Sequence, residues 1–201
     1  MPADTNALAA IEFAKSMDID RLLLQIATTI GRDGTRLGGL VQVTTGGLGM
    51  QATAVEVLDL ATGDRFQIWE PRGQWAKGCR LDESGLAAAE AAVLRSIDAG
   101  IDLLLLNRFG RAESKGRGLI NCFCRALEQG VPILTAVREP FDAAWAEFHG
   151  GLATLLPPEV DIALEWARNA TGNRYKPKIN PSLAATTHPL GLGQEIQLLR
   201  G

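Results

Sequence analysis

The chain has 201 residues, of which 46% are hydrophobic and 21% charged, a composition typical of folded globular proteins rather than disordered ones. Its 20 basic and 23 acidic side chains give a net charge of −3, so a protein that coats nucleic acid with its whole surface is excluded. No apolar run approaches the roughly 20 residues of a membrane-spanning helix, and residues 1–10 lack a secretory-signal pattern. Three cysteines do not form a disulfide framework. We therefore expect a cytoplasmic protein without membrane insertion.

Strand-like and helix-like patterns alternate along the first half of the chain. In chain order we expect a strand over 7–13, a helix from Asp18 to about 30 and a buried strand over 37–44. A glycine-rich loop over 45–49 then leads to an antiparallel hairpin of 51–58 with 65–70. An irregular loop over 71–81 and a helix over 85–99 follow. Asp18 is the expected N-cap of the first helix, and Asp82 or Ser84 that of the second. The turn at 61–64 supports the hairpin.

The second half continues the alternation with strands that are apolar throughout. We expect a buried strand over 101–106, a loop over 107–118, a helix to about 130, a buried strand over 131–137, and helices over 139–148 and 158–170. This order predicts an α/β fold with a mostly parallel central sheet and an antiparallel hairpin added to it. Residues 1–170 are expected to form one α/β domain, and residues 171–201 an extended or disordered C-terminal arm.

Ligands of open parallel sheets bind beyond the carboxyl ends of the strands. Four segments should therefore lie in one region: residues 13–18, 45–49, 107–118 and 137–140.

The segment 107–118 is the most unusual part of the chain. From Asn107 to Arg125 there are five basic residues and one acid, Glu113, so this stretch carries +4 in a protein whose total is −3. It follows a buried strand and leads into a helix, so its backbone N–H groups and the helix dipole can face an anion. The predicted anion site consists of Arg108, Arg111, Lys115, Gly116, Arg117 and Gly118. The alternative is an ordinary solvated surface loop.

A second cationic segment, residues 71–80, contains Arg72 and Arg80 and has no acid. Both arginines are candidates for the same anion site. Cys79 lies beside Arg80, and a neighbouring guanidinium can lower a thiol pKa, which makes Cys79 a candidate ligand or reactive thiol. A buried, inert cysteine is the alternative.

Other chemistry-bearing residues give weaker indications. Cys122 and Cys124 are two apart on an expected helix and cannot chelate one ion, and the chain offers no four-ligand zinc pattern, so we expect no metal site. His149 is expected to hydrogen-bond locally. No GxSxG motif is present, which argues against a serine hydrolase of that type. The tryptophans, Trp145 and Trp166 among them, either stack on a ring or pack in the core.

The middle of the chain resembles the thermophile-type nucleoside-triphosphatases, which are P-loop proteins with a RecA-like, three-layer α/β fold. The resemblance rests on residues 37–41, 57–63 and 102–110, the last matching that family's Walker B strand. Residues 78–82 and 107–118 also resemble an uncharacterised bacterial family often labelled as associated with molybdate transport. The resemblance covers roughly residues 7–168 and implies a nucleotide or molybdate as ligand.

The chain departs from the P-loop pattern at both of its motifs. A working P-loop, GxxxxGK[ST], wraps phosphates with glycine-rich backbone and binds Mg²⁺ through its hydroxyl. Lys15-Ser16 imitates the last pair without preceding glycines, and Asn107 and Arg108 stand where Walker B acids would be. The resemblance therefore implies a degenerate site without ordinary nucleotide hydrolysis.

We favour a non-hydrolytic accessory protein that binds a small anion, either the phosphate of a nucleotide or an oxyanion such as molybdate. One alternative is a Mg-dependent NTPase or phosphotransferase that uses Lys15, Ser16 and Glu113. The other is an interaction module whose basic loops meet an acidic protein partner, or which forms a homo-oligomer through the C-terminal arm. None of these hypotheses includes a nucleic-acid partner.

Overall fold

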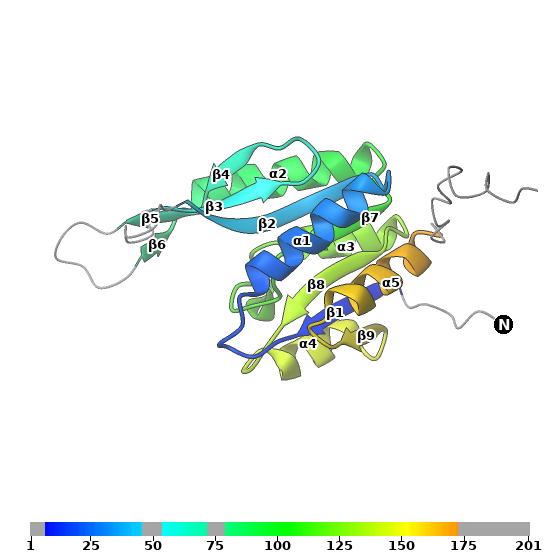
Figure 1. Cartoon of the computed structure of the whole chain (residues 1–201). Coiled ribbons are helices and arrows are strands. Elements are labelled where there is room, and N and C mark those ends of the chain that lie inside the picture. Colours follow the sequence, from blue (N-terminus) through cyan, green and yellow to red (C-terminus); the bar gives the residue numbers. More distant parts are fainter. Residues whose placement is uncertain (1–6, 46–53, 72–78, 173–201) are drawn as a thin grey trace, which may run out of the picture.

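The computed structural model describes residues 7–45, 54–71 and 79–172, which build a seven-stranded sheet with helices on both faces (Figure 1). The strands are β1 (Leu8–Glu12), β2 (Leu37–Thr45), β3 (Ala54–Asp59), β4 (Arg65–Gln67), β5 (Trp69–Pro71), β6 (Cys79–Leu81), β7 (Leu103–Leu106), β8 (Ile133–Val137) and β9 (Ala153–Leu156). The helices are α1 (Ile19–Arg32), α2 (Glu83–Asp98), the 3₁₀ turn η1 (Glu113–Lys115), α3 (Ile120–Glu128), α4 (Asp142–His149) and α5 (Val160–Ala170).

The strand order is β4-β3-β2-β7-β8-β1-β9. Strands β2, β7, β8, β1 and β9 are parallel, whereas β3 and β4 add an antiparallel hairpin at the β2 edge. The expected α/β fold with a mostly parallel sheet and an added hairpin is confirmed. Because all five parallel strands point the same way, their carboxyl ends share one edge of the molecule, which we call the carboxyl edge.

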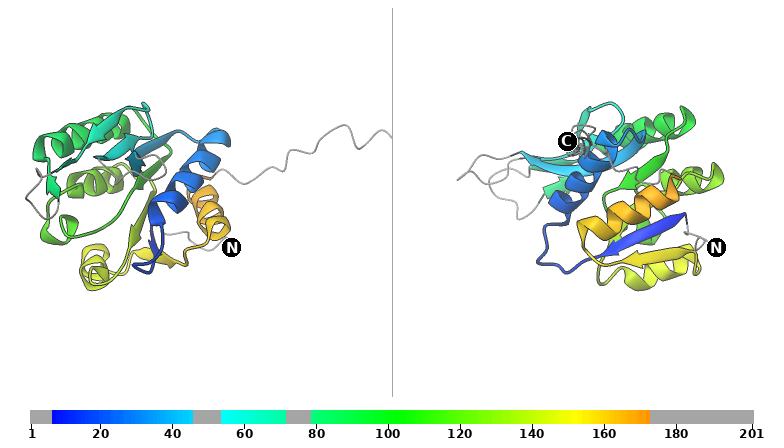
Figure 2. Two further views of the ribbon diagram at one scale, coloured as in Figure 1. Left: turned by 60° about the vertical axis from the view of Figure 1, so that its left-hand side comes forward. Right: turned by 45° about the vertical axis from the view of Figure 1, so that its right-hand side comes forward.

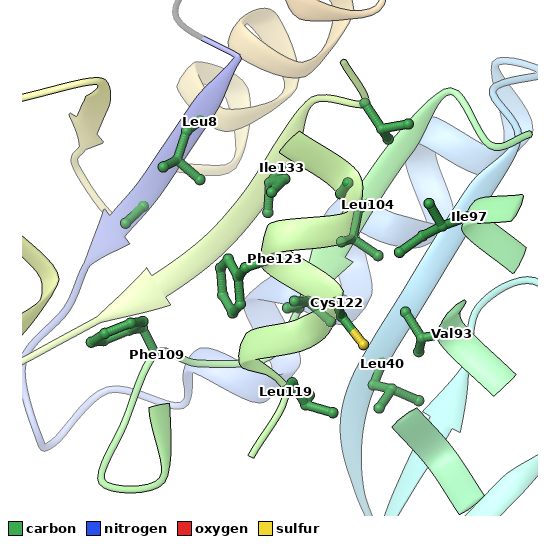
Figure 3. Packing of buried hydrophobic residues seen from close by; sticks show 14 of the residues in the cluster. Leu8, Leu40, Val93, Ile97, Leu104, Phe109, Leu119, Cys122, Phe123 and Ile133 are labelled. Atoms are coloured by element: carbon green, nitrogen blue, oxygen red, sulfur yellow. The ribbon is translucent and has the colours of Figure 1, made fainter. Parts of the chain in front are cut away.

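Two hydrophobic clusters, one on each face, produce the three layers. Alternate residues of a strand face opposite sides, so Leu103 and Leu105 pack with α1 and α5, whereas Leu104 and Leu106 pack with α2, α3 and α4. The two further views of the ribbon show the same division of the helices (Figure 2). Figure 3 shows α3 on its face of the sheet, with Cys122 and Phe123 pointing into the cluster.

The helix beginnings follow the predicted caps. The Asp18 carboxylate accepts a hydrogen bond from the backbone N–H of Arg21, and Asp82 does the same for Ser84 and Gly85. In β2, Gly39 has a φ of 114°, and a Cβ there would lie 1.9 Å from the carbonyl oxygen of Leu105. Only glycine allows β2 and β7 to approach this closely.

Three expectations about local structure are wrong. Residues 71–81 were expected to be irregular, but β5 and β6 pair in antiparallel fashion at either end of that stretch, with Glu70 opposite Arg80. Strand β9 was not expected, because its four residues are largely half-exposed and lack alternation. Helix α4 begins at Asp142 rather than 139. The glycine-rich 46–49 and the proposed arm from residue 173 lie outside the described residues.

Candidate functional site: the carboxyl edge

Three of the four predicted loops meet at the carboxyl edge. The backbone N–H of Phe13, which follows β1, donates to the carbonyl of Val137 at 3.2 Å, and that of Phe109, beyond β7, donates to Ala136 at 2.9 Å. These bonds join residues 13–18, 107–118 and 137–140 into one surface at the ends of β1, β7 and β8, as the strand order requires. The fourth loop, 45–49, lies outside the described residues beyond Thr45.

Arg108 does not present a free guanidinium at this edge. Its Nη2 donates to both carboxylate oxygens of Asp20, at 2.5 and 2.6 Å, and the two side chains are only 34% and 20% exposed. Asp20 lies in the first turn of α1, and its Oδ2 also accepts a hydrogen bond from Gln42 Nε2 of β2 at 2.9 Å. A partly buried ion pair therefore connects the start of α1 with the end of β7.

Two polar atoms beside this ion pair lack a partner among the described residues. They are Nε of Arg108, a donor, and Oδ1 of Asn107, an acceptor, and both are buried. A buried guanidinium N–H without an acceptor carries a desolvation penalty of about 1–3 kcal/mol. The hydrogen-bonding capacity of Arg108 is therefore only partly used by Asp20.

Glu113 closes the loop between β7 and α3. One of its carboxylate oxygens accepts from the N–H of Gly110 at 3.0 Å and the other from the N–H of Leu119 at 3.1 Å. Leu119 is the N-cap of α3, so this internal carboxylate occupies a donor that was expected to face a ligand. Gly118 has a φ of 66°, and a Cβ there would lie 2.2 Å from Oε1 of Glu113. Glu113 therefore occupies the Leu119 N–H and the space beside Gly118, and the binding role of this part of the loop stays a prediction.

The same closure gathers the remaining cations on one short turn. The N–H of Arg117 donates to the carbonyl of Ala112 at 3.0 Å, which brings residue 117 back beside Arg111. Gly116, with a φ of 66°, ends η1 in the left-handed conformation. Arg111, Lys115 and Arg117 are exposed and form no ion pair within residues 7–45, 54–71 and 79–172. We call these three residues the cationic turn.

Phe109 fixes the turn to the core. Its ring is 2% exposed and lies 5.1 Å from that of Trp145 and 6.2 Å from that of Phe123, both at edge-on angles. Figure 3 shows Phe109 and Phe123 on the same side of the sheet. Because Phe109 directly follows Arg108, this aromatic packing fixes the backbone from which Arg108 projects. Trp145 is therefore a core residue rather than an exposed stacking surface, and Trp166 is 5% exposed in the opposite cluster.

Lys15 and Ser16 lie exposed in the loop between β1 and α1. Lys15 lines a cleft of about 690 Å³ at the carboxyl ends of β1, β8 and β9, with Glu12 and Arg138 also in the lining. The Arg138 guanidinium carbon lies 6.0 Å from the ring centroid of Phe13. A larger cleft, about 820 Å³, lies between the C-terminal ends of α1 and α2, far from these loops in the fold.

The other candidates do not reach this edge through any described contact. Arg72 lies outside the described residues, and Cys79 and Arg80 are placed only by the backbone pairing of β6. Cys122 is buried and packs in the core, whereas Cys124 is exposed, so the two thiols face apart. Burial raises the pKa of the Cys122 thiol to about 12.

Some expectations concern small features elsewhere. His149 bonds locally, since its Nδ1 accepts from the N–H groups of Gly151 and Ala153. Within the described ranges no cluster of three or more His, Cys, Asp or Glu side chains is arranged to hold a metal ion. In the same ranges no helix is long and apolar enough to cross a membrane.

Sequence reasoning missed Asp20 and Gln42. A single acid in the first turn of a helix is usually explained by the helix dipole alone, so Asp20 gave no signal of a distant partner. Gln42 did give one, because it is a long polar residue within the apolar run of β2. A polar side chain at such a position indicates a hydrogen-bond partner nearby.

The sheet, its strand order and the loops at the carboxyl edge define a P-loop NTPase type of α/β fold. Two solved structures share this fold. One is a human cancer-related nucleoside triphosphatase, with a TM-score of 0.57 and 14% identity; the match covers 75% of this chain and 87% of that one. The other is THEP1 from Aquifex aeolicus, with a TM-score of 0.54 and 12% identity; the match covers 78% of this chain and 94% of that one. The predicted relation to the thermophile-type nucleoside-triphosphatases is confirmed at the level of the fold.

The chain belongs to the DUF2478 family, described as a protein of unknown function, which it matches over residues 8–166. It is also 39% identical, over 174 residues, to a protein of Bradyrhizobium diazoefficiens named molybdenum import ATP-binding protein ModC 2. That match covers 86% of this chain and 19% of the relative. The chain therefore spans about a fifth of that longer protein.

Proposed function

We propose that the protein is a non-hydrolytic accessory protein that binds a small tetrahedral oxyanion, or the phosphate of a nucleotide, at the carboxyl edge. The cationic turn carries this proposal. Arg111, Lys115 and Arg117 lie on one closed turn, are exposed, and have no carboxylate partner among the described residues. Guanidinium groups suit tetrahedral oxyanions because they donate two parallel hydrogen bonds.

Among the residues that the structure describes, those at the start of α1 do not fit a magnesium-bound triphosphate. Asp18 caps the start of α1 with its own carboxylate, at the position where a P-loop would receive phosphate. The one carboxylate of the first turn, Asp20, is bound to Arg108. A guanidinium so close to a metal site would repel the cation, and this supports anion binding without a metal.

The name of the relative from Bradyrhizobium diazoefficiens supports a role beside molybdenum import. Molybdate is a tetrahedral oxyanion, so the proposed ligand chemistry and that name agree. A second candidate function, a protein-interaction module, is favoured by a separate observation: the matching region is one part of a longer polypeptide in that relative. On that reading the cationic turn would meet an acidic partner surface.

A thermal-shift panel tests the proposal. Molybdate, tungstate, sulfate, phosphate and ATP are added with and without Mg²⁺, and a ligand at 100 times its Kd should add about 2.7 kcal/mol, a shift of roughly 5–10 °C for a chain of this size. The double variant R111A/R117A should lose most of that shift. The matched control, R32A/R95A, removes two exposed arginines from the last turns of α1 and α2 and should keep it.

The same panel separates the alternatives. An unchanged shift in R111A/R117A would remove the cationic turn as the site. Mg-dependent phosphate release that disappears in K15A would establish the NTPase instead. If no small ligand binds, while an acidic partner protein is bound by the wild type and lost in R111A/R117A, the interaction module is correct.

A further inference from the structure

The Arg108–Asp20 ion pair lies at the start of the loop that ends in the cationic turn, and the proposed function uses it only as an argument against a bound metal. From its geometry we infer that Asp20 is a built-in competitor, which occupies Arg108 until a tetrahedral oxyanion replaces it and so sets the affinity of the site. This inference rests on the proposed function and concerns the same edge of the sheet. Three features of the ion pair carry it.

The first feature is that Asp20 accepts hydrogen bonds from only one of the nitrogens of the Arg108 guanidinium. Only Nη2 of Arg108 bonds to Asp20, at 2.5 and 2.6 Å, whereas its Nε is buried and lacks a partner among the described residues. A guanidinium is best satisfied when two of its nitrogens each donate to a different oxygen. An oxyanion with three or four oxygens can accept from Nε and Nη2 together, and would remove the cost of the unsatisfied N–H.

The second feature is that Asp20 remains satisfied when Arg108 leaves. Its Oδ2 keeps the hydrogen bond from Gln42 Nε2 at 2.9 Å, and its place in the first turn of α1 leaves it next to the positive end of the helix dipole. Breaking a buried ion pair is costly mainly because a charge is left without compensation. Here both partners have compensation available, Asp20 from the protein and Arg108 from the ligand.

The third feature is access. The Arg108 side chain is 34% exposed, and Phe109, the next residue, holds its backbone against the aromatic cluster. The side chain can therefore exchange partners without movement of the strand. Arg108 is the second residue after β7, at the start of the loop that ends in the cationic turn.

The test is calorimetric titration of the full chain at low salt with three probes: molybdate, inorganic phosphate, and ADP without Mg²⁺. These arms distinguish a free oxyanion from a nucleotide as the source of the tetrahedral group. In D20N the competing charge is gone, while an oxygen remains to accept from Gln42. We expect the bound probe to bind about 10-fold more tightly, equivalent to about 1.4 kcal/mol.

Two further variants make the result specific. D18N removes an equal charge from the same helix end, but Asp18 bonds to the Arg21 N–H and not to Arg108, so affinity should change less than about 2-fold. In an R108Q background the effect of D20N should fall to a similar size, since coupling requires both members of the pair.

Every outcome of these titrations either supports or overturns the inference. Tighter binding in D20N alone, lost in the R108Q background, supports the inference. Binding by the wild type that D20N leaves unchanged, weakens, or alters no more than D18N overturns the inference and leaves the proposed function standing. Absence of binding by wild type and D20N with all three probes overturns the proposed function and the inference with it.

Discussion

Glu113 should contribute more to stability than any other exposed or half-exposed glutamate of the described chain. Its carboxylate accepts two backbone hydrogen bonds, at 3.0 and 3.1 Å, that close the loop and cap α3. A net value of about 1–1.5 kcal/mol for each bond is suitable here, because the loop is half-exposed and water replaces part of the loss. The substitution E113A should therefore lower the free energy of unfolding by about 2–3 kcal/mol.

Urea denaturation measures this directly. With a slope of about 2 kcal/mol per M, the midpoint of E113A should fall by roughly 1 M at unchanged slope. The control is E165A, since Glu165 is exposed on α5 and Ala favours helices; it should shift the midpoint by less than about 0.3 M. Hydrogen exchange should show the loss at the amides of Gly110 and Leu119. Equal midpoints for E113A and wild type would refute the role assigned to Glu113.

Three other predictions concern the same structure. G118A should lower stability by about 2 kcal/mol, because its φ of 66° is strained for alanine and its Cβ would collide with Glu113; an unchanged urea midpoint would contradict the loop geometry. The hydrogen bond from Arg36 lowers the pKa of Asp102 below 3.8, so the stabilisation that the ionised Asp102 provides is present above pH 3.8 and disappears as the pH falls through the lowered value. In acid titrations D102N should therefore lose less stability than wild type between pH 5 and about pH 2. Parallel curves for the two proteins would argue against this role of Asp102. Cys122, with its pKa raised to about 12, should resist iodoacetamide at pH 8 while Cys124 is alkylated, as tandem mass spectrometry of the native protein can show; rapid labelling of both would mean that α3 opens readily.

The sequence predicted those elements whose local residue pattern already matches the place that they take in the folded protein. Helix α1 has an N-cap at Asp18 and apolar residues at helical spacing, and β7 is four buried leucines in succession. Strands β6 and β9 were missed because three or four residues are too few for a period to be visible, and the predicted strand over 65–70 is divided into β4 and β5. Pro71 and the prolines after β9 further hid the extended backbone on either side of them.

The candidate site divides along the same line. The basic character of 107–118 is local, so the cationic turn could be predicted as a group, and its role as a binding site remains a prediction. The partner of Arg108 could not be predicted, because Asp20 is 88 residues away and meets it only through the crossover of α1. In the sequence, Glu113 is only one negative charge among five positive ones. Its closing of the loop depends on the backbone N–H groups of Gly110 and Leu119, which a charge count does not reveal.

The contact between Arg108 and Asp20 also determines what holds the start of α1 against the end of β7. In P-loop enzymes the hydroxyl that starts the helix and the acid that ends the neighbouring strand share a divalent ion. Here the carboxylate is on the helix and the cation on the strand, so the polarity of that junction is inverted and both charges are encoded in the polypeptide. Its assembly is consequently complete when the chain has folded, and neither chelators nor fluctuations in magnesium supply should alter the spacing between α1 and β7.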